Sequence, residues 1–297
     1  MSGTALTIRA ALQEGRRRLS DAGITAARSE VEWLLSRLMG MRPLELYLCQ
    51  DDVTHAVAEQ FLRQLEARAS GTPLQYLLGE AEFFGQPFLV RPGVFIPRPE
   101  TETLVEAVIR HLGQRADLAS RDLRLIDVGT GSGCIAVTLA RHLPACLIIA
   151  VELSWRALCV ARQNVQRAGL QQRVQLVQAD ALCAIRGPVD GVVANPPYLL
   201  SAQIDQLPRE VRREPRLSLD GGEDGCVLLR RLLRQAPRLL APGGFVALEC
   251  AEDQIEDFAQ ATATCAWVEH VRVVHDVSRR PRGLLLSGAT RPLSVGA

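Results

Sequence analysis

The sequence contains no lysine, and all 34 of its basic residues are arginine. Enzymes that depend on a phosphate-loop lysine, a lysine Schiff base or a lysine general base are therefore excluded. Eight cysteines are present but never as Cys-x-x-Cys, and the five histidines form neither a His-x3-His nor a His-Glu-x-x-His pattern. Cysteines scattered in this way are typical of reduced thiols in a core, so the sequence predicts no disulfides. Because neither the cysteines nor the histidines have the spacing of metal ligands, it predicts no metal site.

Long apolar runs and a strong net charge are also absent. No 18-residue apolar stretch or signal-peptide core occurs, and the formal net charge is only +1. We therefore expect no membrane partner and no direct contact with nucleic acid. The apolar content of 47% and the charged content of 23% are typical of a soluble globular protein. We expect a cytoplasmic protein, for which a monomer is favoured, although the sequence does not give the oligomeric state.

The spacing of apolar residues divides the chain into three regions. In residues 1–72, Val31, Leu34, Leu35 and Leu38 form one helical stripe and no strand pattern occurs, which predicts a small helical bundle for substrate recognition. In residues 73–95, short apolar runs such as Leu74–Leu78 are cut by glycine and proline, which predicts a β-hairpin linker.

Residues 96–297 alternate between strand and helix patterns. A helix is expected from about Thr103 to Leu112, capped by Thr101 or Thr103. The alternation predicts an α/β fold, with a Rossmann-like, doubly wound and largely parallel sheet. The expected strands are Arg124–Val128, Leu147–Val151, Val174–Ala179, Val189–Ala194, Phe245–Glu249, Val268–His275 and Leu284–Gly288.

Polar residues occur at the ends of the first four expected strands, namely Asp127, Glu152, Asp180 and Asn195. Ligands of open α/β sheets bind beyond the carboxyl ends of the strands, so we expect these residues to open on one crevice. Glu152 could accept both protons of a ribose diol, and Asp180 could accept from an adenine amino group.

A glycine turn, Gly129-Thr130-Gly131-Ser132-Gly133, follows Asp127. Glycine permits positive φ and close approach of a ligand to the backbone. A dinucleotide fingerprint would need its third glycine at position 134, where this chain has cysteine. The spacing therefore favours a nucleoside joined to an amino acid over a pyrophosphate. A simple glycine turn without a ligand is the alternative.

The tetrapeptide Asn195-Pro196-Pro197-Tyr198 follows the fourth expected strand. Its prolines fix two φ angles and have no N–H, so this corner offers carbonyl acceptors with few competing donors. The Asn195 side chain adds an acceptor, and Tyr198 adds a flat ring. Such a set suits a planar –NH2 group, whose two N–H bonds need two acceptors. An ordinary strand-ending turn is the alternative.

These motifs together resemble the class I S-adenosylmethionine-dependent methyltransferases that act on nitrogen in planar –NH2 groups. More narrowly, nearly the whole chain resembles the release-factor glutamine N5-methyltransferases (HemK-type). The stretches that carry this narrower resemblance are Gly71–Gly79, Phe83–Gly85, Ile96–Glu102 and Leu219–Gly225. The resemblance implies S-adenosylmethionine as cofactor, and as substrate the glutamine in the Gly-Gly-Gln loop of class I peptide-chain release factors, which act in translation termination.

By position, the resemblance also implies roles for the motifs. The glycine turn and Asp127 would line the methionine part of the cofactor, and Asn195 would also lie beside the cofactor. Glu152 would hold the ribose, and Asp180 with Ala181 would lie at the adenine. Asn195 to Tyr198 would hold the glutamine amide, and Ile96–Glu102 would close over the cofactor. For catalysis, we expect the side-chain oxygen of Asn195 and the carbonyl of Pro196 each to accept one amide N–H, while Tyr198 packs on the amide plane.

Several alternatives remain open. A ribosomal-protein glutamine methyltransferase is the nearest, and a nucleic-acid methyltransferase acting on adenine N6 or guanine N2 would use similar chemistry. A nicotinamide dehydrogenase is disfavoured by the glycine spacing, and an inert scaffold is disfavoured by the intact Asn-Pro-Pro-Tyr. Residues 199–222 are rich in arginine and have little periodicity. They are either a lid that docks a protein substrate or a solvated loop.

Overall fold

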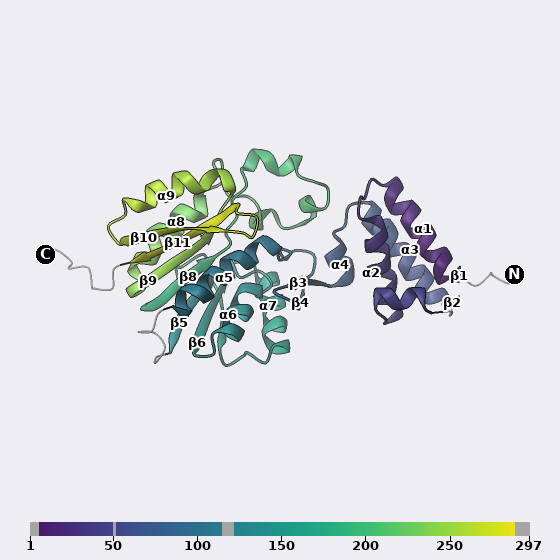
Figure 1. Cartoon of the computed structure of the whole chain (residues 1–297), viewed down its shortest axis with the longest axis horizontal. Coiled ribbons are helices and arrows are strands. Elements are labelled where there is room, and N and C mark those ends of the chain that lie inside the picture. The colour runs from purple at the N-terminus through teal and green to yellow at the C-terminus, as the bar shows by residue number, and fades with distance from the viewer. Residues whose placement is uncertain (1–5, 50–51, 115–121, 289–297) are drawn as a thin grey trace. The chain divides into compact units, whose positions relative to one another are not determined.

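The computed structural model describes residues 6–49, 52–114 and 122–288. The predicted start of the first region, at residue 1, and the predicted end of the third, at residue 297, lie outside the described residues. The chain forms two compact units (Figure 1). The first comprises Met1–Glu80 together with Pro208–Arg213, and the second comprises Ala81–Leu207 and Glu214–Ala297.

The first unit is a helical bundle, as predicted. Val31, Leu34 and Leu35 are fully buried in its core. One detail of the prediction was wrong, because two very short strands, β1 (Leu6–Thr7) and β2 (Asp52–Val53), pair antiparallel. The helices are α1 (Ile8–Asp21), α2 (Ala27–Met39), the 3-10 helix η1 (Pro43–Tyr47), α3 (His55–Ala69) and α4 (Leu74–Leu78).

The prediction of a β-like run at Leu74–Leu78 was wrong, because these residues form the one-turn helix α4. Pro73 is at its N-cap, and Gly79, in the left-handed region at φ +77, ends it. A short apolar run fits a helical turn as well as a strand. The predicted hairpin follows, with β3 (Glu80–Phe83) and β4 (Gln86–Leu89) joined by two residues of positive φ, which is typical of a tight hairpin turn.

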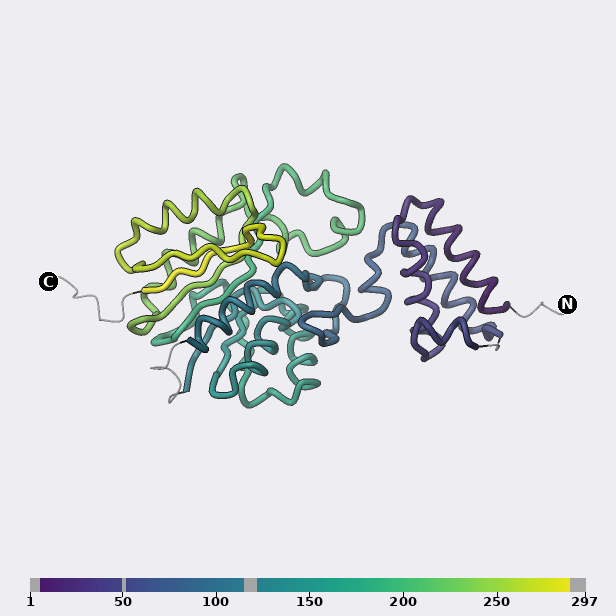
Figure 2. Tube along the Cα trace, viewed as in Figure 1, coloured from purple at the N-terminus to yellow at the C-terminus, as the bar shows by residue number. Residues whose placement is uncertain are grey.

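The second unit is built on a seven-stranded sheet in the order β10-β11-β9-β8-β5-β6-β7. The path of the backbone through this unit runs from blue to yellow in Figure 2. Each pair is parallel except those of β11, which runs antiparallel to both of its neighbours. The predicted doubly wound, largely parallel sheet is therefore confirmed. The strands are β5 (Leu123–Val128), β6 (Cys146–Glu152), β7 (Val174–Gln178), β8 (Val189–Ala194), β9 (Leu240–Glu249), β10 (Val268–His275) and β11 (Pro281–Gly288).

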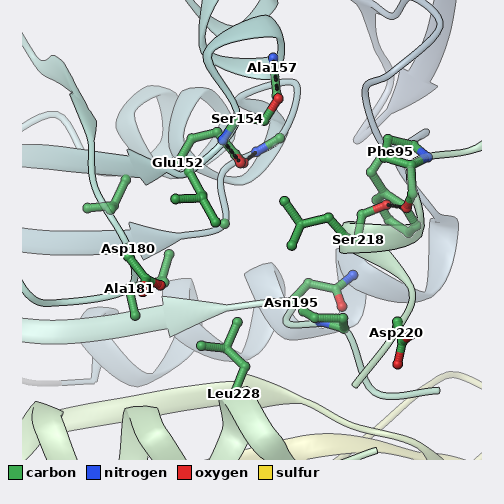
Figure 3. A pocket seen from close by; sticks show the side chains of 18 of the residues that line it. Phe95, Glu152, Ser154, Ala157, Asp180, Ala181, Asn195, Ser218, Asp220 and Leu228 are labelled. Carbon is green, nitrogen blue, oxygen red and sulfur yellow. Dashed lines mark hydrogen bonds between the residues drawn. The ribbon is translucent and has the colours of Figure 1, made fainter. Parts of the chain in front are cut away.

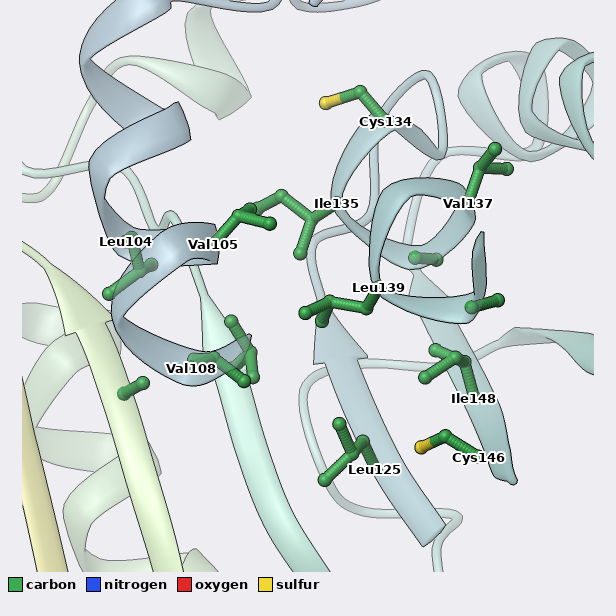
Figure 4. Packing of buried hydrophobic residues seen from close by; sticks show 14 of the residues in the cluster. Leu104, Val105, Val108, Leu125, Cys134, Ile135, Val137, Leu139, Cys146 and Ile148 are labelled. Atoms are coloured by element: carbon green, nitrogen blue, oxygen red, sulfur yellow. The ribbon is translucent and has the colours of Figure 1, made fainter. Parts of the chain in front are cut away.

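Helices cover both faces of this sheet because successive strand residues point to opposite sides. Leu125 of β5 packs with α5 and α6 in one buried cluster (Figure 4), whereas the next residue, Ile126, packs with α8 in another. The helices are α5 (Pro99–Gly113), α6 (Cys134–His142), α7 (Trp155–Arg167), α8 (Val227–Gln235) and α9 (Ile255–Ala263), with 3-10 turns η3 (Ser201–Gln206), η4 (Val211–Arg213), η5 (Arg216–Ser218), η6 (Ala236–Arg238) and η7 (Glu252–Gln254).

Helix α5 begins earlier than predicted. Arg98 occupies its N-cap without a side-chain hydrogen bond, and Pro99 is its first residue. Proline is favoured there because the first helical N–H needs no partner within the helix. The prediction that Thr101 or Thr103 caps the helix was therefore wrong. Thr101 lies inside the first turn, where its side chain is buried.

Candidate active site

A cavity of about 380 Å³ lies at the carboxyl ends of the central strands, within the size range of small-molecule sites. Glu152, Asp180 and Asn195 line it, as does Gly129 after β5. In Figure 3, Asn195 lies between Glu152 and Asp180 on one side and Phe95 on the other. The structure thus brings together three of the four predicted strand-end residues.

The glycine turn after β5 has the backbone that its sequence predicts. Gly129, Gly131 and Gly133 have φ of +71°, +56° and +83°. Both carboxylate oxygens of Glu152 accept a main-chain N–H, from Gly131 and from Ser154, each at 2.9 Å. These bonds hold Glu152 against the turn, while each oxygen keeps a further lone pair for a ligand.

Asp127, the fourth strand-end residue, is fully buried behind the turn and does not line the cavity. Its Oδ2 accepts from the Thr130 hydroxyl and from the Ala136 N–H at 3.1 Å. Burial raises the pKa of Asp127 to about 7, although these hydrogen bonds lower it. Asp127 therefore holds the turn from behind.

The other residues of the turn also lie behind the cavity wall, since Thr130, Ser132 and Gly133 do not line it. One residue that holds the turn in place is not indicated by the sequence. Asn164 of α7 is buried, and its Nδ2 donates to the Ser132 carbonyl at 2.8 Å. Its position within an amphipathic helix gave no signal of this contact.

The predicted adenine side of the cavity carries Asp180 and Ala181. Asp180 accepts from Arg231 of α8 at 2.7 Å. Arg231 also lines the cavity, a position that nothing in its sequence context indicates. Ala181 has φ +49°, a left-handed conformation that costs a residue with a side chain about 1–2 kcal/mol. Such strain is often found at binding sites.

The corner after β8 contributes Asn195 and Pro197 to the cavity wall, whereas Pro196 is buried and Tyr198 does not line the wall. Asn195 Nδ2 donates to the Thr101 hydroxyl oxygen at 2.8 Å. The Tyr198 hydroxyl donates to Glu249 Oε1 at 3.3 Å.

Thr101 and Glu249 were not predicted as site residues. Burial raises the pKa of Glu249 to about 7, although hydrogen bonds from Thr101 and Tyr198 lower it. Burial likewise raises the pKa of Tyr198. Both hydroxyls and the carboxyl thus form one buried network behind Asn195.

The segment 199–222 is part of the site at its C-terminal end. Residues 215, 217, 218 and 220–222 line the cavity. Asp220 is central to this stretch, because it accepts from the Ser201 hydroxyl, the Gly222 N–H and Arg216. These bonds lower the pKa of Asp220. The interpretation as a solvated loop therefore does not describe this end of the segment.

The segment Ile96–Glu102 does not line the cavity, although Gly93 and Phe95 just before it do. It is fixed from two sides. Glu214, which is buried within residues 199–222, accepts from the Ile96 N–H at 3.0 Å and pairs with Arg98. Glu102 accepts from the Phe84 N–H at 2.7 Å, which ties the segment to the hairpin.

Two family models match the chain. The PrmC N-terminal domain matches residues 10–79, and the Methyltransferase small domain matches residues 87–210. A release factor glutamine methyltransferase from Moorella thermoacetica is 41% identical over 285 residues, which cover 94% of this chain and 98% of that protein. The chain belongs to the release factor glutamine methyltransferase family.

Relatives of this family member include a protein with a different name. A 4-amino-L-phenylalanine/4-methylamino-L-phenylalanine methyltransferase from Streptomyces pristinaespiralis is 35% identical, with coverage of 90% of this chain and 91% of that protein. The crystal structure of a methyltransferase from Pyrococcus furiosus is similar in fold, with a TM-score of 0.50, 20% identity and coverage of 70% of this chain and 91% of that one. Among the described residues no helix is both long and apolar enough to span a bilayer.

Proposed function

We propose that this chain transfers the methyl group of S-adenosylmethionine to the side-chain amide nitrogen, N5, of the glutamine in the Gly-Gly-Gln loop of class I peptide-chain release factors. The family to which the chain belongs supports the substrate. The single structural observation that supports the chemistry is the shared cavity, in which Asn195 faces the same space as Gly129, Glu152 and Asp180.

The lining residues fit a methyl donor built from a nucleoside and an amino acid. Glu152 is held rigidly at the end of β6, where its free lone pairs can accept from ribose hydroxyls. A Cβ on Gly129 would meet no protein atom within 4 Å, so the turn leaves room for a ligand beside its backbone. Asp180 and Ala181 would lie at the adenine. The donor supplies a methyl group already activated on a sulfonium.

An amide nitrogen is a weak nucleophile because its lone pair is delocalised into the carbonyl. The chain must therefore orient the nitrogen and stabilise the positive charge that develops on it. Asn195 lines the cavity, and its Oδ1 is the first proposed acceptor of an amide N–H, while the carbonyl of Pro196 is the second. The hydroxyl of Tyr198 is already engaged with Glu249, so the proposed role of Tyr198 falls to its ring, which would pack on the amide plane. The proton is then released to water.

The test is incubation of the chain with labelled methyl donor and a class I release factor, followed by mass spectrometry of the Gly-Gly-Gln peptide. Label on N5 of the glutamine is the expected result. Parallel incubations contain ribosomal proteins, RNA and free 4-amino-L-phenylalanine. Label in one of these instead of the release factor would contradict the proposed substrate.

The proposed role of Asn195 has its own test. Asn195→Ala should lower turnover by at least about 100-fold, the scale of losing one preorganised polar group. The dissociation constant of the donor, measured by calorimetry, should stay close to that of the wild type. Unchanged turnover would refute the assignment of Asn195.

A further inference from the structure

The side chain of Asn195 can face a substrate in two orientations with opposite chemistry. A carboxamide presents an acceptor at its oxygen and two donors at its nitrogen, although the two ends have nearly the same shape. Only the oxygen can accept an N–H from a substrate –NH2 group, because the nitrogen would oppose donor to donor. The site therefore needs something that fixes which end faces the cavity.

Thr101 is the partner that can make this choice. It is buried in the first turn of α5 with 2% of its surface exposed, and its hydroxyl oxygen accepts from Asn195 Nδ2 at 2.8 Å. A hydroxyl carries a single proton, which it could instead donate to the Asn195 oxygen. The orientation of Asn195 thus depends on where the Thr101 proton points.

Glu249 determines that direction. It is buried at the end of β9 with 3% of its surface exposed, and it accepts from the Tyr198 hydroxyl at 3.3 Å. The Thr101 hydroxyl is near enough to lower the pKa of this carboxyl. Above its pKa of about 7 the Glu249 carboxyl is ionised, has no proton to donate and can only accept. Its Oε2 has no hydrogen-bond partner among the described residues, so a hydroxyl proton that points toward it meets an open acceptor. The Thr101 proton is therefore drawn to Glu249, and the lone pairs of the hydroxyl remain for Asn195.

We propose that Thr101 and Glu249 are positioning residues, which orient the Asn195 carboxamide so that its oxygen faces the substrate amide. Thr101 acts directly on Asn195, and Glu249 acts through Thr101 while also fixing the Tyr198 hydroxyl. This inference rests on the proposed function of Asn195 as an acceptor. It concerns the direction of the hydrogen bonds in the network, and not only the packing around it.

Thr101→Val tests the inference because valine keeps the shape of threonine and lacks the hydroxyl. We expect the single-turnover rate of methyl transfer to the release factor to fall about 10- to 100-fold, the scale of a misoriented group. The dissociation constant of the donor should not change. Thr101→Ser, which restores the hydroxyl, should return the rate close to that of the wild type. Thr103→Val, in the same helix, is the matched control and should leave the rate unchanged.

A double-mutant cycle distinguishes positioning from a structural effect. In an Asn195→Ala background, Thr101→Val should cost almost nothing further, because there is no carboxamide left to orient. An equal fold-loss in both backgrounds would overturn the inference, as would failure of Thr101→Ser to restore the rate. Glu249→Gln gives a second cycle if Thr101→Val does not fold, since its amide can donate to Thr101 and reverse the direction of the bond. A wild-type chain that does not methylate glutamine would refute the proposed function, whereas additive cycles with an active wild type would refute only the positioning role.

Discussion

The second unit contains two buried carboxyls that serve the same cavity in different ways. Asp127, in β5, supports the glycine turn, and Glu249, at the end of β9, supports the corner that carries Asn195. Burial raises the pKa of each to about 7, and each has one carboxyl oxygen without a hydrogen-bond partner among the described residues. Neither lines the cavity.

The two carboxyls differ in where their partners lie along the chain. Asp127 binds residues three and nine positions away, so it organises a local turn. Glu249 binds Tyr198, which is 51 residues away, and Thr101, which is on α5. One carboxyl is thus part of a local motif, whereas the other joins three separate elements. We expect the first to affect donor binding and the second to affect the chemical step.

The largest expected effect comes from Asp127→Ala. The substitution leaves the Thr130 hydroxyl and the Ala136 N–H buried without their acceptor, which costs about 1–3 kcal/mol for each group. We therefore expect the free energy of unfolding in urea to fall by about 2–6 kcal/mol and donor affinity to fall with it. By contrast, Glu249→Gln should lower turnover while donor affinity is retained. A loss of donor affinity in Glu249→Gln equal to that in Asp127→Ala would show that the two carboxyls do not differ in role.

The pH dependence of stability should reveal the same two groups. Burial raises the pKa of Glu249 from 4.5 to about 7, so the folded chain binds this proton more tightly than the unfolded chain. The resulting stabilisation is fully present below pH 4.5 and is lost as the pH rises through 7. Glu100 and Arg282 also face Glu249, and they raise and lower its pKa respectively. The pKa of Asp127 is likewise raised, from 3.8 to about 7, so its contribution to stability is also lost as the pH rises.

We therefore expect the free energy of unfolding of the wild type to fall between about pH 4.5 and pH 7. Glu249→Gln should remove about 2–3 kcal/mol of that fall, and the part due to Asp127 should remain. Urea unfolding at a series of pH values measures this directly. Glu269→Gln, which changes an exposed glutamate, is the control. A pH profile of Glu249→Gln that parallels the wild type would show that Glu249 has no such role.

The smallest effect concerns the turn that Asp127 supports. Gly129 and Gly40 have almost the same φ, +71° and +69°, and a Cβ on either would meet no atom within 4 Å. Alanine should therefore cost both positions a similar strain of about 1–2 kcal/mol. Only Gly129 lines the cavity, so only Gly129→Ala should weaken donor binding, by about tenfold in calorimetry. Equal donor affinities in the two variants would show that the ligand does not approach this turn.

The sequence predicts features whose physical cause is local. The alternating periods predict the doubly wound sheet, and the glycine turn and the proline corner each lie within a few consecutive residues. Thr101 and Asn195, however, are 94 residues apart, and nothing in the spacing of either indicates the other. The local pattern predicts only a helix cap at Thr101 and only the end of a strand at Glu249. Their roles depend on a tertiary arrangement that brings α5, β8 and β9 together.

The ion pairs of Arg68 have a consequence for dissecting this protein. Its side chain is only 7% exposed and binds Glu30 within the helical bundle and Glu210 from the distant stretch Pro208–Arg213. The bundle is therefore assembled from two separate pieces of the polypeptide. A gene fragment that stops at residue 80 would encode a bundle without Glu210. The remaining fragment would carry Pro208–Arg213 without the Arg68 side chain that Glu210 binds. A helical bundle cut from the chain at the hairpin would therefore keep the pair between Arg68 and Glu30 and lose the one with Glu210.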